Sequence, residues 1–230
     1  MSASPPSPSA WRTRWFFVCP VDLLAEDDCH VTVDLPELSI TLQNFRGTLS
    51  GFRNICSHQQ LPMRAAGLGR GPLRCQQHGW TYNADGIPVG IPDGDETIET
   101  DVATRRLLAL RPIGVAAIEG GIFARVEDDG SLPDAKWFAD AELAGATRRQ
   151  AVTRRLPAGS PPPIDGPTLS NLSIELMGDF ALLGWVVPQG PDAISATVAL
   201  YALAEAPEEI PAETRAVYDK AALALEQAAA

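Results

Sequence analysis

The sequence has 230 residues, 45% of them hydrophobic and 20% charged, which is enough to bury the core of one large domain or two small ones. A net charge of −11 argues against a nucleic-acid partner, because phosphate binding needs a basic surface. No apolar run approaches the roughly 18 residues that a membrane span needs, and the N-terminus lacks the basic start of a secretory signal. We therefore expect a cytoplasmic protein.

The first part of the chain reads as β-structure. Residues 1–10, rich in Pro and Ser, are expected to be a disordered tail, followed by one domain at 11–130. Short apolar runs broken by Gly, Pro and Asp are typical of antiparallel sheets. The expected strands are 15–20, 31–33, 38–42, 48–52, 107–110, 115–118 and 122–126. Hairpin turns are expected at 44–47 and 119–121.

A helix at 134–145 and a Pro- and Gly-rich linker at 156–167 are expected to fill the range 131–167. Four arginines between them have a spacing that suits one face of a helix and the binding of an acidic partner: Arg148, Arg149, Arg154 and Arg155. Residues 168–230 are expected to form a second unit. Its expected strands are 168–177, 180–187 and 193–203, and its helix is 211–227.

Two of the three histidines lie beside two of the four cysteines. The order is C-x-H, sixteen residues, then C-x-x-H, and the residues are Cys56, His58, Cys75 and His78. Zinc could use these four ligands. A 2Fe–2S cluster of the Rieske type is favoured, because each segment offers one thiolate and one imidazole, so one iron can take both thiolates and the other both imidazoles. Cys19 and Cys29 are left as free thiols.

The residues around this motif resemble the Rieske domain of the large (α) subunits of ring-hydroxylating oxygenases. The similarity covers about residues 11–128 and includes the run from His78 through Gly79, Trp80 and Tyr82 to Pro92. It departs at Gln59 and Gln60, where that family usually has a basic residue and a glycine. Trp80, which stands where the respiratory Rieske branch has a serine, removes a hydroxyl donor and favours a reduction potential of about −150 mV.

The resemblance implies an α+β fold, mainly antiparallel β: a Rieske domain of small stacked sheets, then a reduced helix-grip-like sheet with a C-terminal helix. It also implies redox partners, namely a reductase or ferredoxin and a full-length oxygenase subunit, and it is compatible with homo- or hetero-oligomers. An oxygenase of this family needs a second, mononuclear iron on two histidines and a carboxylate. After the four cluster ligands only His30 remains, expected at the surface or in a turn.

Three hypotheses for function follow. The first is an electron-transfer protein or subunit, related to oxygenases, that passes single electrons to a partner's iron centre. The second is an oxygenase component whose catalytic iron site is completed by a partner subunit. The third is a binding or redox-sensing protein that keeps the cluster as a structural element. The sequence names neither the electron donor and acceptor nor the substrate.

Overall fold

The computed structural model describes residues 10–92, 101–133, 143, 145–158, 160, 168–169 and 171–229. The tail expected at 1–10 lies outside this part except for Ala10, which begins the short helix α1 (Ala10–Thr13). The helix expected at 134–145 and residues 161–167 of the expected linker also fall largely outside it. The domain boundaries given above therefore stay predictions.

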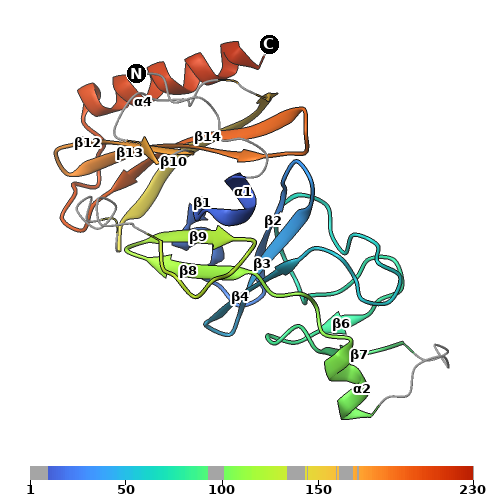
Figure 1. Cartoon of the computed structure of the whole chain (residues 1–230). Helices are drawn as coiled ribbons and strands as arrows, with labels where there is room; N and C mark the ends of the chain where they lie inside the picture. Colours follow the sequence, from blue (N-terminus) through green and yellow to red (C-terminus); the bar gives the residue numbers. More distant parts are fainter. Residues whose placement is uncertain are drawn as a thin grey trace.

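The N-terminal half is built from small antiparallel sheets. One has the order β1-β9-β8, with β1 (Phe16–Pro20), β8 (Gly114–Ile118) and β9 (Gly121–Arg125). The next has the order β4-β3-β2-β5, with β2 (Cys29–Asp34), β3 (Ser39–Phe45), β4 (Thr48–Arg53) and β5 (Gly67–Arg70). Of these sheets, the hairpin of β6 (Thr81–Tyr82) and β7 (Pro88–Gly90) lies farthest from the C-terminal helix (Figure 1).

Both predicted hairpin turns are present. Arg46 and Gly47 connect β3 to β4, Glu119 and Gly120 connect β8 to β9, and all four residues have positive φ, as a two-residue type I′ turn requires. The strand predicted at 107–110 is wrong. Leu107 ends helix α2 (Val102–Leu107), whose start is capped by the Asp101 carboxylate accepting hydrogen bonds from the Ala103 and Thr104 amides.

The C-terminal sheet confirms the strands predicted at 180–187 and 193–203 and the predicted helix, whereas the range 168–177, predicted as one strand, contains two antiparallel strands. Its order is β10-β14-β13-β12-β11, with β11 (Thr168–Leu169), β12 (Leu172–Met177), β13 (Phe180–Pro188) and β14 (Ala193–Ala202). Helix α4 (Ala212–Ala228) covers one face, with Tyr218 and Leu225 buried against it. The other face packs on the N-terminal sheets, so β13 is apolar on both faces.

Strand β10 (Thr147–Pro157) corrects the prediction for the four arginines. Arg148, Arg149, Arg154 and Arg155 lie on this extended strand, paired with β14, and not on one face of a helix. Because alternate residues of a strand face opposite sides, the arginines do not form one basic surface. Every second residue of β10 faces helix α4. Val152 and Leu156 pack in the cluster beneath α4, and Arg154 between them pairs with Glu226 of α4.

The two halves share one core. Phe17 of β1 makes edge-on ring contacts with Phe123, at a centroid distance of 5.6 Å, and with Trp185 of β13, at 5.8 Å. The buried Asn171 side chain accepts a hydrogen bond from the Phe17 amide (3.1 Å) and donates one to the Phe17 carbonyl (2.6 Å). In the described part of the chain, no helix combines the length and apolarity needed to cross a membrane.

Candidate metal centre

The four predicted ligands lie on two loops with the same backbone design. In the Cys56 loop (residues 56–61), the Cys56 amide donates to the Leu61 carbonyl (2.8 Å) and the Gln60 amide donates to the Cys56 carbonyl (2.9 Å). In the Cys75 loop (residues 75–80), the Cys75 amide donates to the Trp80 carbonyl (2.8 Å) and the Gly79 amide donates to the Cys75 carbonyl (3.0 Å). The fifth residue of each loop has positive φ: 57° at Gln60 and 77° at Gly79.

The two thiols lie together in the protein interior. Cys56 and Cys75 are 2% and 1% exposed, belong to the same buried cluster, and lie near enough for the Cys75 thiol to raise the pKa of Cys56. The Tyr82 hydroxyl lies 3.0 Å from Cys56 Sγ and accepts a hydrogen bond from the Ser57 amide (3.2 Å). Burial raises the pKa of the Cys56 thiol, while the Tyr82 contact lowers it. The hydroxyl is thus positioned to stabilise a thiolate.

The two imidazoles lie together closer to the surface. The rings of His58 and His78 meet nearly at right angles, with centroids 4.9 Å apart. His58 is half-buried and stacks flat on the fully buried Trp80, at a centroid distance of 4.8 Å and an interplanar angle of 5°. His78 is exposed. One imidazole is therefore held by packing, and the other meets solvent.

The donor set fits a two-iron cluster. Thiol lies beside thiol and imidazole beside imidazole, which is the pairing that a Rieske centre needs for its two different irons. Among the described residues, no group of three or more His, Cys, Asp or Glu side chains converges on a single ion position. Two pairs on adjoining loops suit a cluster with two metal positions better than one tetrahedral ion.

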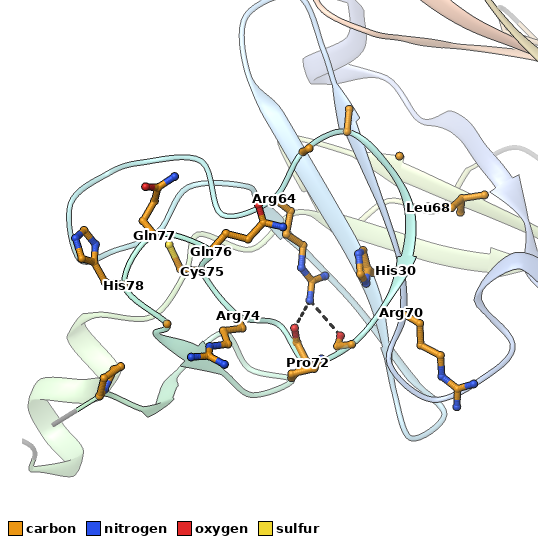
Figure 2. Close-up of a pocket in the computed structure, with 16 residues that line it drawn as sticks. His30, Arg64, Leu68, Arg70, Pro72, Arg74, Cys75, Gln76, Gln77 and His78 are labelled. Carbon is orange, nitrogen blue, oxygen red and sulfur yellow. Dashed lines mark hydrogen bonds between the residues drawn. The ribbon is translucent and has the colours of Figure 1, made fainter.

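A basic hollow of about 890 Å³ lies beside the Cys75 loop (Figure 2). Among the described residues that line it, every charged side chain is an arginine: Arg64, Arg70 and Arg74. Arg64 is only 7% exposed and is fixed by hydrogen bonds from Nη2 to the Gly71 and Pro72 carbonyls, and burial lowers its pKa to about 10. The hollow therefore carries positive charge in a chain of net charge −11.

His30 also lines this hollow, half-exposed on strand β2, at the surface and not in a turn. Its ring lies against Gly69 of β5, where a Cβ atom would approach Nε2 to 2.6 Å. Burial, and then the positive charge of Arg64, lower its pKa. Cys19 is buried and Cys29 is half-buried, both as free thiols.

Sequence reasoning missed the residues that support the ligands. The motif includes Tyr82, but the sequence does not show that its hydroxyl lies 3.0 Å from Cys56 Sγ, a contact that the expectation of few hydroxyl donors does not include. The sequence indicates only that Trp80 lacks a hydroxyl donor, whereas in the structure its ring is the surface on which His58 stacks. Arg64 carries no motif signal, and only the fold brings it to the Cys75 loop.

Comparisons with known proteins agree with this geometry. The family model for the Rieske [2Fe-2S] domain matches residues 14–105. The apo form of the quaternary ammonium Rieske monooxygenase CntA superposes with a TM-score of 0.67 at 12% identity, over 95% of this chain and 77% of that one. Naphthalene 1,2-dioxygenase from Rhodococcus sp., bound to indole, gives a TM-score of 0.63 at 16% identity, over 96% and 78%. A search of curated proteins gave no significant match.

The likeness to the two oxygenases extends through the C-terminal sheet and helix, so it covers more of the chain than the family match does. At these identities it shows the fold, and the family match shows the cofactor, which is a Rieske-type 2Fe–2S cluster. Residues 14–105 therefore match the Rieske [2Fe-2S] domain family, in a chain that has the fold of Rieske oxygenases.

Proposed function

We propose that Cys56 and Cys75 hold one iron of the cluster and that His58 and His78 hold the other. The side-by-side thiols and the side-by-side imidazoles support this assignment. The buried cysteines exclude water from the sulfur side, and the Tyr82 hydroxyl donates to the Cys56 thiolate. When bound, a cluster of this type supplies reversible uptake of a single electron.

We infer that the protein is an electron carrier or an electron-transfer subunit that serves a partner's iron centre. The observation that carries this proposal is the exposure of His78, which brings one edge of the ligand set to the surface while both thiols stay buried. For a quaternary ammonium Rieske monooxygenase of similar fold, inter-subunit electron transfer is described. An exposed imidazole gives a partner a short path to the cluster.

The basic hollow supports an acidic redox partner, such as a reductase or ferredoxin. Arg74 and Arg64 lie on the part of the hollow next to the Cys75 loop, and Arg70, which pairs with Glu26, lies at the end away from His78 (Figure 2). Positive charge focused in a concave surface raises the association rate of an acidic protein and makes that rate fall with salt. Electron transfer from an acidic donor should therefore slow as ionic strength rises.

The second candidate is an oxygenase component whose catalytic iron is completed by a partner subunit. The oxygenase-like fold over 95% of the chain favours it. The sequence contains no histidine after His78, so the C-terminal sheet has carboxylates such as Glu175 and Asp192 but lacks imidazole donors of its own. Carboxylates alone suit Mg²⁺ or Ca²⁺ better than an iron poised for O₂ activation.

Iron content and turnover separate the two candidates. A carrier should contain two irons per chain, and an oxygenase a third. The purified protein, supplied with a reductase, Fe²⁺, O₂ and candidate aromatic or amine substrates, should accept and donate electrons without forming product. Hydroxylated product from the pure single chain would reject the carrier proposal and favour an oxygenase with an unfamiliar iron site.

A further inference from the structure

A second, smaller cavity lies on the face of the C-terminal sheet that is turned away from α4. Its volume is about 190 Å³, and strands β1, β2 and β5 form one side while β10, β13 and β14 form the other. Gly67 and Leu68 of β5 line both this cavity and the basic hollow beside the Cys75 loop. Strand β5 is thus a wall shared by the two spaces.

Most of the cavity wall is apolar. Val18, Val31 and Val33 line it from the N-terminal sheets, and Trp185 and Val187 line it from β13. Val31, Trp185 and Val187 keep 7%, 5% and 7% of their surface exposed, whereas Val33 is fully buried behind them, so a molecule inside would contact the first three. A cavity of about 150 Å³ in another protein accommodates benzene, and this one has room for one ring with a small substituent.

Polar side chains line the rest of the cavity. Thr153 and Thr197 share a hydrogen bond of 2.9 Å between their hydroxyls, which leaves one hydroxyl proton available to a ligand. Ser195 and Gln189 also line this part. Cys19 lines the cavity too, and burial followed by the Asp22 charge raises the pKa of its thiol, so it adds no negative charge. Arg148 is the one charged side chain among the described lining residues.

A β-bulge brings Arg148 to this face. The pairing of β10 with β14 shifts between Arg148 and Gln150, so Arg149 is an extra residue in the strand. Without the shift, Arg148 would lie with Val152 and Arg154 on the α4 side, because strand residues alternate. Instead it lies with Ala151 and Thr153 at the cavity, and its Nε is 3.5 Å from Asp22 Oδ2. Within the described residues, its terminal nitrogens make no hydrogen bond, and Asp22 is the ion-pair partner of the guanidinium.

We propose that this cavity binds a compact, one-ring carboxylate, with the ring against Trp185 and Val187 and the carboxylate on Arg148 and the threonine hydroxyls. A guanidinium with free terminal nitrogens binds a carboxylate through charge-assisted hydrogen bonds. The apolar wall selects the ring by burial. The cluster ligands take no part, so the site stands independently of the redox proposal.

Binding of fluorobenzoate to the cluster-loaded protein, followed by fluorine NMR, tests this proposal. Fluorobenzamide serves as the neutral comparison, since it keeps the ring and lacks the charge. We expect saturable one-to-one binding of fluorobenzoate, displaced by benzoate, and weaker binding of fluorobenzamide. Arg148→Gln should weaken fluorobenzoate binding at least about tenfold, as expected for a lost charge-assisted contact, and leave fluorobenzamide binding unchanged.

Two further variants complete the design. Ala151→Leu places added bulk at the cavity wall from an exposed position and should weaken both probes. Arg154→Gln removes an arginine from the same strand but on the α4 side, where it pairs with Glu226, and should change neither affinity. Fluorobenzoate that fails to saturate, or that binds Arg148→Gln as tightly as the parent, would overturn the proposal. An unchanged cluster EPR spectrum and melting temperature show that a variant is folded.

Discussion

The Cys56 loop and the Cys75 loop close with the same pair of backbone hydrogen bonds, yet their ligands have different surroundings. His58 stacks on Trp80 and is half-buried, whereas His78 is exposed beside the basic hollow. Gln60 occupies the left-handed position that Gly79 occupies in the other loop. The two loops therefore have the same backbone conformation, but the surrounding side chains bury the histidine of the first loop and leave the histidine of the second exposed to solvent.

The largest expected effect comes from removing either imidazole. His58→Ala and His78→Ala should each abolish the cluster, because one iron loses half of its protein ligands. The two apoproteins should differ in stability: His58→Ala loses the stack on Trp80 and should unfold with about 1 kcal/mol less free energy than His78→Ala. Denaturant unfolding of the two metal-free variants measures this. Equal stabilities would contradict the division between a packed and an exposed ligand.

Replacing Gly79 in the Cys75 loop should destabilise the protein more than replacing Gln60 at the matching position of the Cys56 loop. Gly79→Ala adds a Cβ at φ 77° that would approach Arg74 Nη2 to 2.8 Å. We expect a loss of about 1–2 kcal/mol of unfolding free energy and lower cluster occupancy.

The reverse change, Gln60→Gly, should stabilise the Cys56 loop by about 0.5 kcal/mol. Relief of left-handed strain, about 1–2 kcal/mol, is offset in part by the greater flexibility of glycine in the unfolded chain, about 0.4–1 kcal/mol. Thermal unfolding of the cluster-loaded protein measures the difference. A destabilised Gln60→Gly would mean that the Gln60 side chain supports the loop in its own right.

Tyr82→Phe tests the surroundings of the two cysteine thiols, one from each loop. The variant removes the hydroxyl 3.0 Å from Cys56 Sγ and keeps the ring. If that hydrogen bond favours the reduced protein by about 1 kcal/mol, its loss lowers the one-electron potential by about 40 mV. Protein-film voltammetry gives the value. Tyr201→Phe is the matched control, because its hydroxyl binds Asp22, and its potential should equal that of the parent.

The smallest effect concerns His30, on the far side of the basic hollow. Its pKa is lowered in the folded protein, so between that value and the ordinary 6.5 the unfolded chain binds more protons. This histidine therefore removes stability as the pH falls below 6.5. His30→Gln should show a shallower loss of apoprotein stability from neutral to mildly acidic pH. An unchanged slope would mean that His30 titrates equally in both states.

Much of this comparison could be predicted from the sequence, because the ligands and turns carry local signals. The C-x-H and C-x-x-H spacings predict the ligand set that we propose, and the turns at Arg46-Gly47 and Glu119-Gly120 could be predicted as hairpins. The failures have physical causes. Leu107 looks like strand by composition, yet the Asp101 cap begins a helix before it. The arginines of β10 have a helical spacing, yet pairing with β14 imposes a strand.

Supporting residues could not be predicted, because their partners are brought close only by the fold. Arg64 reaches the carbonyls of Gly71 and Pro72 across a loop, and Tyr82 reaches back to Cys56 from β6. The bulge at Arg149 likewise depends on the register of β14, which no local pattern encodes. Short motifs therefore predict which residues can bind the metal, whereas the solvent exposure of those residues, their backbone strain and their hydrogen bonds depend on how the whole chain packs.

The central claim is that two buried thiols and two outer imidazoles hold a Rieske-type cluster used for electron transfer. EPR of the reduced protein, combined with iron and sulfide analysis of the same sample, tests it most directly. The account predicts a red-brown protein with two irons and two sulfides per chain and an average g value below that of the free electron, as histidine ligation of one iron requires. The His30→Ala variant should give the same spectrum. A colourless protein with stoichiometric zinc would contradict the account.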